Sequence, residues 1–410
     1  MKGHVTTALR WSDLPLSAVS YLVFGNACHE RFRAAFAASL GMQTEAVRLF
    51  GSGRAALHAF VKAMGLQQGD EVLLPGYTCV VVPNVFMHLG ISVRYVDIER
   101  GHCNVSAQGW AEAIGPSTKL VLVPHNFGIV TAGLTELRAA FPAVIFVEDA
   151  AHAWGSKDQA GTAAGRAGHA AFYSFEYSKC LSTGLGGALL INDAGLRQRF
   201  VAAQGTLLTT PSVATLLKQL LTLSYHRLCM SLPRRVLQVV QTLLRAPSRA
   251  LGLVAQTPAS ELDGRSQPDY AQALHPLSAA VGLPQVSRAS ALWALRRRQA
   301  LHYDELLAGS VRIHALPRAA GDVLLRYPVR VDPRHRETLA QELLELGIEP
   351  GRWFDDVVHP KGSLRYGYAD GQCPVGESLA QAILNLPLGL HANLSAAQSA
   401  GLRALALAPA

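Results

Sequence analysis

The chain has 410 residues, half of them hydrophobic, which is enough for a large core and predicts two or more domains. Its formal net charge of +8 comes from residues 194–260, which hold eight basic residues and no acidic one, so the charge does not indicate a nucleic-acid-binding protein. The cysteines lack CxxC spacing, which argues against a zinc site or a disulfide framework and predicts a reducing cytoplasm; they stand at positions 28, 79, 103, 180, 229 and 373.

The first predicted elements follow an N-terminus that does not resemble a signal peptide. The first 25 residues carry charges beside a short apolar run. Residues 46–50 predict a strand, and the apolar spacing of 54–66 predicts a helix that Ser52 caps and Gly65 ends. No charge-free apolar run approaches the ~18–20 residues that are needed to cross a bilayer.

Six apolar runs predict further strands, and helical stretches separate the early ones. Such continuous apolar runs are typical of strands buried on both faces of a sheet. The pattern therefore predicts an α/β fold with a mostly parallel sheet, and residues 1–200 as a large domain. The runs cover residues 71–76, 91–98, 118–128, 143–150, 170–175 and 186–193.

The pattern changes after about residue 200. Residues 201–262 predict apolar and basic helices that form an insertion or connector. Residues 263–410 predict a helical link and a smaller α+β domain. Its expected elements are a strand at 324–332 and helices over 335–348, 376–384 and 395–407.

The glycine loop after the first strand matches G-x-G-x-x-A and so permits two interpretations. A dinucleotide site would need an acid at the end of the second strand. Asp70 and Glu71 instead lie at the start of that strand. Free N–H groups at a helix N-terminus still favour a phosphate, so the loop predicts a phosphate site of another kind.

Four residues later in the chain each have a structural explanation when they are taken singly. Asp149 ends an apolar strand and can cap the following turn, with His152 packed beside it. Ser174 ends the next strand, and Lys179 follows it in a loop before glycines 184, 186 and 187. Together with the phosphate loop, these residues fit a site for pyridoxal 5′-phosphate (PLP). This cofactor needs donors for its phosphate, a carboxylate for its ring nitrogen and a lysine for its aldehyde.

The sequence resembles the DegT/StrS-type sugar aminotransferases, a family of fold-type I PLP enzymes. The resemblance covers most of the chain outside the basic segment. The stretches that carry it are SGRAAL (52–57), GDEVLLPGYTC (69–79), HNFG (125–128), EDAAHA (148–153), SFEYSKCLSTGLGG (174–187) and CPVGESLAQAILNLPL (373–388).

The resemblance implies a role for each matching residue. Lys179 would form the Schiff base and move the proton, and Asp149 would pair with the ring nitrogen. Ser174 and the backbone at Gly53 and Arg54 would bind the phosphate. His152 would contact the ring or its phenolic oxygen. The resemblance also implies a homodimer with its active sites at the subunit interface.

Three positions depart from the pattern of the family. Arg54 replaces a threonine, so a hydroxyl is missing, although the guanidinium could reach the phosphate or a substrate anion. Cys79 replaces the aromatic residue that stacks on the cofactor ring, and Tyr77 or His152 could take over that contact. Gln272 lies near the position where the family has an asparagine that reaches the phosphate of the partner subunit.

The implied activity is a PLP-dependent transamination. The amino group would come from an amino acid, with glutamate as the expected donor. The acceptor would be a keto sugar, nucleotide-linked, in polysaccharide or amino-sugar biosynthesis. Two alternatives stay open: another PLP reaction on the same scaffold, and a non-catalytic regulatory or scaffold relative. Dehydratase relatives replace the lysine with histidine, so Lys179 argues against a dehydratase.

The basic segment has four interpretations. It could be a helical insertion that packs on the dimer or over the mouth of the active site. Residues 205–255 could make a weak contact with an anionic membrane surface, since apolar helices with arginines suit that position. The segment could also attract anionic nucleotide-sugars. Nucleic-acid binding is not expected, because no recognition motif is present.

Overall fold

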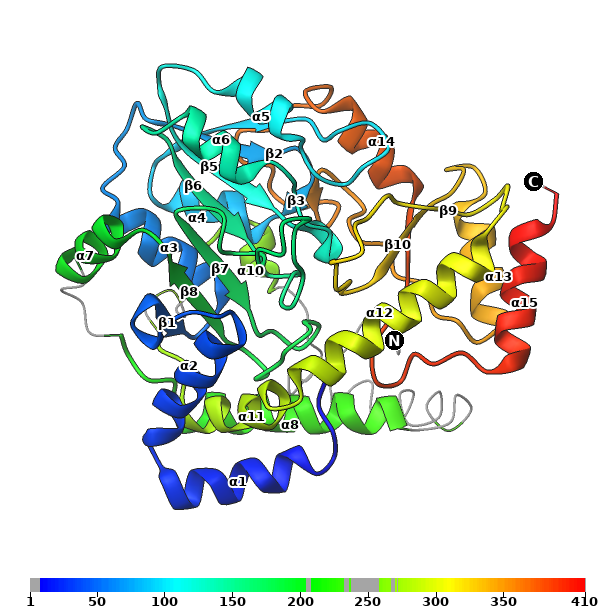
Figure 1. The fold of residues 1–410 in the computed structure, drawn as a ribbon, viewed down its shortest axis with the longest axis horizontal. Helices are drawn as coiled ribbons and strands as arrows, with labels where there is room; N and C mark the ends of the chain where they lie inside the picture. The colour runs from blue at the N-terminus through cyan, green and yellow to red at the C-terminus, as the bar shows by residue number, and fades with distance from the viewer. Residues whose placement is uncertain are drawn as a thin grey trace.

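The computed structural model describes residues 8–203, 208–231, 236, 258–266, 270 and 272–409. A seven-stranded sheet and a three-stranded sheet form its two β layers. The long helix α12 (Ala289–Leu307) runs from the side of the larger sheet to the smaller one (Figure 1).

The larger sheet has the strand order β1-β8-β7-β6-β5-β2-β4. Strands β4, β2, β5, β6 and β7 are parallel to their neighbours within this group, while β8 pairs antiparallel with both β7 and β1. The predicted α/β fold with a mostly parallel sheet is therefore confirmed. The strands are β1 (Val47–Phe50), β2 (Glu71–Pro75), β4 (Ser92–Val96), β5 (Thr118–Pro124), β6 (Ile145–Asp149), β7 (Ala170–Ser174) and β8 (Gly187–Ile191).

Helices cover the larger sheet and bury its apolar strands. The first of them after β1 begins as predicted, because the Ser52 hydroxyl accepts the Ala55 N–H at 3.2 Å. It ends before Gly65, whose φ of +59° suits glycine. The helices of this part are α1 (Asp13–Phe24), α2 (Ala27–Ser39), α3 (Gly53–Ala63), α4 (Val81–His88), α5 (Ala107–Ala113), α6 (Leu134–Ala140) and α7 (Ala194–Ala203), with 3₁₀ turns η1 (Thr44–Ala46) and η2 (Asn126–Gly128).

The second half of the chain forms the smaller sheet and the remaining helices. Strand β10 lies at the centre of that sheet, between β9 and β12. A two-stranded parallel pair, β3 with β11, connects the two halves of the chain. The elements are β3 (Thr78–Cys79), α8 (Val213–Ser231), α10 (Ala259–Leu262), α11 (Pro276–Val286), β9 (His314–Ala315), β10 (Tyr327–Arg330), α13 (Arg336–Glu345), β11 (Val358–His359), α14 (Pro374–Ala382), β12 (Ile383–Leu386) and α15 (Ala396–Leu407).

The prediction of a helix over 376–384 was wrong at the C-terminal end of that helix. It stops at Ala382, and Ile383 begins β12. Ile383 and Leu384 are fully buried in the ladder with β10, where strand pairing outweighs the helical spacing of the sequence. Helix α8 accounts for part of the helical pattern that was predicted over 205–260. The second apolar run of that segment, 237–246, lies outside the described residues.

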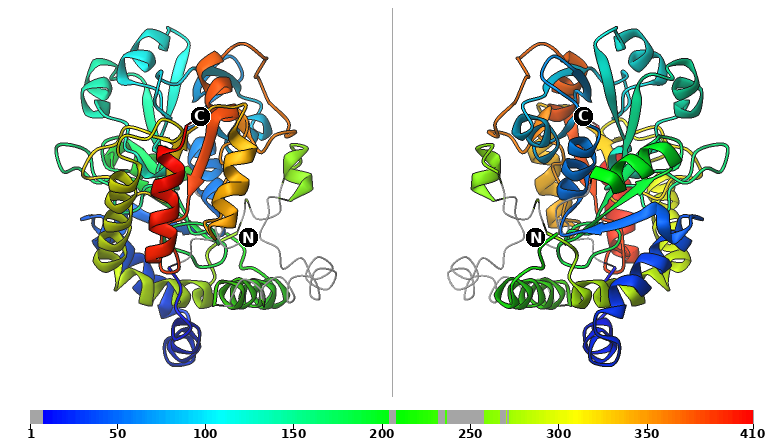
Figure 2. Two further views of the ribbon diagram at one scale, coloured as in Figure 1. Left: turned by 90° about the vertical axis from the view of Figure 1, so that its right-hand side faces the viewer. Right: turned by 90° about the vertical axis from the view of Figure 1, so that its left-hand side faces the viewer.

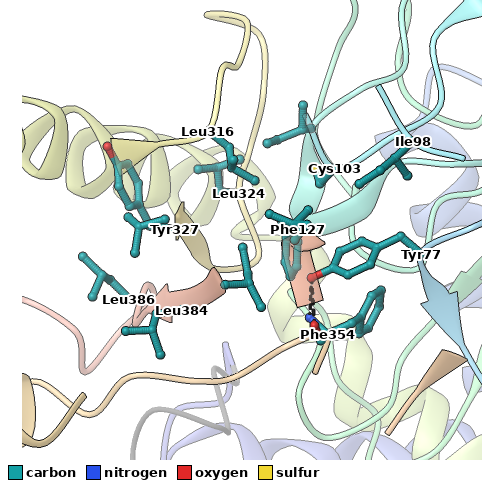
Figure 3. Packing of buried hydrophobic residues seen from close by; sticks show 14 of the residues in the cluster. Tyr77, Ile98, Cys103, Phe127, Leu316, Leu324, Tyr327, Phe354, Leu384 and Leu386 are labelled. Atoms are coloured by element: carbon teal, nitrogen blue, oxygen red, sulfur yellow. Dashed lines mark hydrogen bonds between the residues drawn. The ribbon is translucent and has the colours of Figure 1, made fainter. Parts of the chain in front are cut away.

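The two halves meet in one buried hydrophobic cluster next to the end of β2 (Figure 3). The Tyr77 hydroxyl accepts the Phe354 N–H and donates to the Phe354 carbonyl, each at 2.9 Å. Both rings also approach Phe127. This contact fixes the loop before β11 against the edge of the larger sheet where the predicted site residues gather.

Candidate active site

The N-terminus of α3 forms one corner of the site. Gly53 lies so close to the end of β7 that a Cβ atom there would be 3.2 Å from the Cβ of Ser174. A Cβ at Gly187 would overlap the backbone nitrogen of Gly53. Only residues without side chains permit this approach. The corner therefore brings helix N–H groups and the Ser174 hydroxyl together, which are the donors that a phosphate needs.

Lys179 lies in a tight turn after β7. Its N–H donates to the Glu176 carbonyl at 3.0 Å, and the Glu176 carboxylate accepts the N–H and the hydroxyl of Ser178 at 3.0 and 2.6 Å. Gly186 has a φ of +156°, and a Cβ there would collide with the Thr183 hydroxyl. The turn and its glycine therefore hold the lysine at a fixed place beside the strand ends.

Asp149 is the last residue of β6, the strand next to β7 in the larger sheet. One carboxylate oxygen accepts the Ala151 N–H at 3.0 Å. Burial raises the pKa of this carboxyl group, and the positive charges of Lys179 and His125 oppose the rise. His125 is itself fixed, because its Nε2 lies 2.7 Å from the buried Glu148 carboxylate. The arrangement places an acid, an amine and an imidazole within electrostatic reach of one another.

His152 lies in a stack of aromatic rings. Its Nδ1 accepts the Phe127 N–H at 3.2 Å, and its ring is nearly parallel to that of Trp353, at 11° and 6.3 Å between centroids. Burial lowers the pKa of His152 well below its usual value, and the charges of Lys179 and Arg326 lower it further. The ring is therefore neutral near pH 7, and a flat, neutral ring can lie against another aromatic system.

Cys79 belongs to the same pocket. Burial raises the pKa of its thiol to about 11; Lys179 opposes this rise, and the carboxylates of Glu261 and Asp149 add to it. Tyr77, two residues earlier, is fully buried with its hydroxyl bonded to Phe354, as described above. Of the two residues that the sequence suggested for stacking on a cofactor ring, the geometry therefore favours His152.

The side chain of Arg54 turns toward a residue that the sequence did not single out. Its Nη1 lies 2.9 Å from a carboxylate oxygen of Glu261, whose side chain is fully buried. Glu261 lies in α10, and its backbone carbonyl accepts the side-chain N–H of Asn84 at 2.7 Å. The guanidinium, which could have reached a phosphate or a substrate anion, is thus engaged by a carboxylate in this structure.

Sequence reasoning missed four residues of the pocket wall: Glu261, Arg326, Trp353 and His359. Arg326 is fully buried, with its guanidinium 4.0 Å from the centroid of the Trp353 ring, and burial lowers its pKa to about 9. The Lys179 amine lies 5.7 Å from the same centroid. His359 is opposite Cys79 in the β11–β3 pair. None of these residues has a fixed spacing from the matched motifs, so no signal in one sequence identifies them.

The structure brings the sequence-predicted residues together. Cys79 lies in β3, and the others lie at or just after the carboxyl ends of β6 and β7 and at the start of α3. Ligands bind at these ends of the strands in open α/β sheets. The pocket can offer phosphate donors, a carboxylate, an amine and a stacking surface. The predicted residues are Gly53, Arg54, Cys79, Asp149, His152, Ser174 and Lys179.

Comparisons with known proteins find relatives that match nearly the whole chain. The chain is 28% identical over 375 residues to the dTDP-4-dehydro-2,3,6-trideoxy-D-glucose 4-aminotransferase of Saccharopolyspora spinosa. The aligned residues cover 90% of this chain and 85% of that protein. The structure of the aminotransferase TlmJ from Streptoalloteichus hindustanus matches 99% of this chain and 97% of its own, with a TM-score of 0.72 at 24% identity. The GDP-4-keto-6-deoxymannose-3-dehydratase ColD has the same fold, with a TM-score of 0.71 at 18% identity, over 98% of this chain and 99% of its own.

The sequence model of one family matches residues 21–209 and 254–400, which is most of the chain. The interruption falls within the basic segment. The match extends across both sheets and includes every predicted site residue. The chain belongs to the DegT/DnrJ/EryC1/StrS aminotransferase family.

Proposed function

We propose that this protein is a PLP-dependent aminotransferase that moves an amino group from an amino acid, glutamate in the first instance, to a nucleotide-linked keto sugar. The product would enter amino-sugar or polysaccharide biosynthesis. Family membership supports the reaction class. The relative from Saccharopolyspora spinosa, by its name a 4-aminotransferase of a dTDP-linked keto sugar, supports the class of acceptor.

The residues of the pocket fit PLP. The cofactor, when bound, supplies an electron sink for the bond changes at the amine carbon. Ser174 and the N–H groups at Gly53 and Arg54 would bind its phosphate. Asp149 would pair with its ring nitrogen, and His152 and Cys79 would lie against its ring.

The observation that carries the proposal is the joint placement of Asp149, Lys179 and the glycine corner at one edge of the sheet. Lys179 would bond to the cofactor aldehyde, and its amine, once the amino substrate has displaced it, would take the proton from the substrate carbon that carries the amino group. The turn of Glu176 fixes the backbone that carries this amine beside the end of β7. The carboxylate of Asp149 would keep a proton on the ring nitrogen, and the neutral His152 ring would lie against the cofactor and exclude water there.

The test is cofactor uptake. Purified protein should take up PLP and turn yellow, and borohydride should fix the cofactor to Lys179, which peptide mapping by mass spectrometry can show. Transamination is then measured with glutamate and a panel of nucleotide-linked keto sugars. A colourless protein that takes up no PLP would refute the proposal. PLP uptake with release of water from a sugar, and no amino transfer, would favour a dehydratase. Uptake with no reaction would favour a non-catalytic relative.

We further propose a homodimer. Helix α1 protrudes at one end of the molecule, beside α8 and α11 (Figures 1 and 2), and exposes apolar side chains that a second copy would cover. Light scattering after gel filtration should give twice the 43.8 kDa of one chain. A monomer that floats with anionic vesicles would point instead to a membrane contact through 205–255. The exposed side chains are Leu16, Val19, Leu22, Val23 and Phe24 in α1 and Leu217, Leu221 and Leu228 in α8.

The division into residues 1–200, 201–262 and 263–410 remains a prediction, in which the middle part is an insertion. The compartment that we propose is the cytoplasm. All six cysteines lie in the described part of the chain, and none of them forms a disulfide there, which supports a reducing environment. In the described residues, no helix is long and apolar enough to cross a membrane.

A further inference from the structure

The pocket contains a charge that a phosphate site should avoid. Glu261 has a fully buried side chain. It is close enough to Cys79 to influence that thiol. It is also paired with Arg54, the second residue of the helix whose N-terminus forms the phosphate corner. A buried carboxylate at this place would repel the phosphate dianion unless a cation balances it.

Rigid contacts fix the backbone that carries this carboxylate. The buried Asn84 side chain donates to the Glu261 carbonyl, and the Leu364 N–H donates to the Leu262 carbonyl at 2.8 Å. His88 is 2.8 Å from the Gly264 carbonyl. Helix α10 is therefore held on both sides, by α4 and by the loop after β11, and Glu261 cannot leave the pocket without disturbing both.

From this geometry we propose that Arg54 and Glu261 act as one charge-balanced unit, in which Arg54 neutralises the buried carboxylate so that the α3 N-terminus can bind the phosphate of the cofactor. Arg54 then contributes through Glu261 and through its own backbone N–H, and its guanidinium need not contact the phosphate. Both are positioning residues of the cofactor site. The inference rests on the proposed function.

The departure from the family pattern at Arg54 then has an explanation. The arginine in place of a threonine removes a hydroxyl, and it also supplies the cation that Glu261 requires. Restoring the threonine with Arg54→Thr should weaken cofactor binding, because the carboxylate remains. A threonine at position 54 should allow normal cofactor binding only when Glu261 is also replaced by a neutral residue.

A double-mutant cycle tests the coupling. The variants are Arg54→Met, Glu261→Gln and the double variant, and the measurement is the dissociation constant for PLP from its visible absorbance. Arg54→Met should bind PLP about tenfold more weakly or worse, since removing one member of a buried pair exposes the other charge. Glu261→Gln should bind PLP as tightly as the wild type or more tightly. The double variant should lie within about threefold of the wild type.

One result for the double variant would contradict the proposal. If Arg54 binds the phosphate directly, the double variant will be as weak as Arg54→Met, and the proposal falls. Should Arg54→Met fail to fold, the double variant alone decides, since it lacks both charges of the pair. Arg312→Met is the matched control: it removes an arginine from another partly buried pair, with Glu342 at 2.9 Å, and should leave PLP affinity unchanged.

Two further measurements distinguish this proposal from a purely structural role of Arg54 and from a failure of the proposed function. The deficit of Arg54→Met should shrink as the pH falls and the carboxylate takes up a proton, whereas a purely structural role would show no such trend. Inorganic phosphate serves as a second probe, read as protection against thermal unfolding. If the wild type takes up no PLP, the proposed function fails. Protection by phosphate in the wild type and the double variant, with none in Arg54→Met, would still support the pair; equal protection, or none in any variant, would overturn it.

Discussion

The two sides of the pocket differ in how closely they follow the family. On the amine side, Asp149, His152 and Lys179 match the motifs in full, and short hydrogen-bonded turns hold them. The substitutions lie elsewhere: Arg54 is at the phosphate corner, and Cys79 is at the position that stacks on the ring. The chemistry explains the contrast. A Schiff base with the aldehyde needs a lysine, and a carboxylate keeps the ring nitrogen protonated, whereas many donors can bind a phosphate.

The comparison also shows how a departure is accommodated. The phosphate side keeps its backbone geometry, with Gly53 close to Ser174 and Gly187. The change lies in the side chains, where a buried ion pair replaces a hydroxyl donor. Such a pair specifies position more than it adds stability. The amine side should therefore lose function abruptly on substitution, and the phosphate side should lose affinity by degrees.

The largest effect is expected for Lys179→Ala. The variant loses the amine that bonds to the cofactor and moves the proton, so transamination should fall by at least about a thousandfold. Borohydride should fix no cofactor to the protein. Lys119→Ala, an exposed lysine of β5, is the control and should behave as the wild type. Residual activity near the wild-type rate would mean that another residue does the proton transfer.

Asp149→Asn should separate cofactor binding from turnover. The lysine is intact, so borohydride should still fix PLP to it, but turnover should fall by about a hundredfold or more, because a neutral amide cannot keep the ring nitrogen protonated. Asp158→Asn, at a carboxylate that accepts the Thr162 N–H, is the control. Near-normal rates for Asp149→Asn would show that the ring nitrogen has another partner.

Asp149→Asn should lower turnover, but it should stabilise the apoprotein against unfolding. Burial raises the pKa of Asp149 above 3.8, so in the pH range just above that value the folded state binds more protons than the unfolded state. The free energy of unfolding therefore falls as the pH rises through this range. Asparagine removes the cost of the buried charge, so apo Asp149→Asn should melt at a higher temperature than the wild type at pH 7 and show no gain below about pH 4.

Tyr77→Phe tests the contact that connects the two halves of the chain. It leaves the N–H and carbonyl of Phe354 without their partner, which should lower the free energy of unfolding by about 1–3 kcal/mol. PLP affinity should also fall severalfold, because Phe354 packs against His152. Tyr303→Phe, another buried tyrosine, loses a bond to the Pro387 carbonyl and should cost stability alone. Equal affinities in the two variants would show that the contact does not shape the pocket.

The sequence predicted the parts of the site that local rules govern. The Ser52 cap, the strand that ends at Asp149 and the glycine turn after Lys179 each depend on residues within a few positions of one another. Glu261 and Trp353 reach the pocket from segments far along the chain, and their place depends on how α10 and the loop before β11 pack. That packing is set by side-chain shape over the whole interface, which no spacing in a single sequence encodes.

The smallest effect concerns His169, which directly precedes β7 and lies outside the pocket. The His169 Nδ1 accepts the Phe146 N–H at 3.0 Å, and burial lowers the pKa of this histidine to about 4. Because the unfolded state takes up a proton near pH 6.5 and the folded state does so only near pH 4, stability should be lost as the pH falls between these values. The ring is partly exposed, so the loss should be about 1–2 kcal/mol.

His169→Asn keeps an acceptor for the same N–H and removes the titration. Its melting temperature should fall less than that of the wild type between pH 6.5 and pH 4, while PLP affinity at pH 7 stays the same. His152 also accepts a backbone N–H at Nδ1 and also has a lowered pKa, but it lies in the pocket. His152→Asn should therefore reduce acid sensitivity and cofactor affinity together. If both variants changed PLP affinity alike, His169 would contribute to the cofactor site and would not serve stability alone.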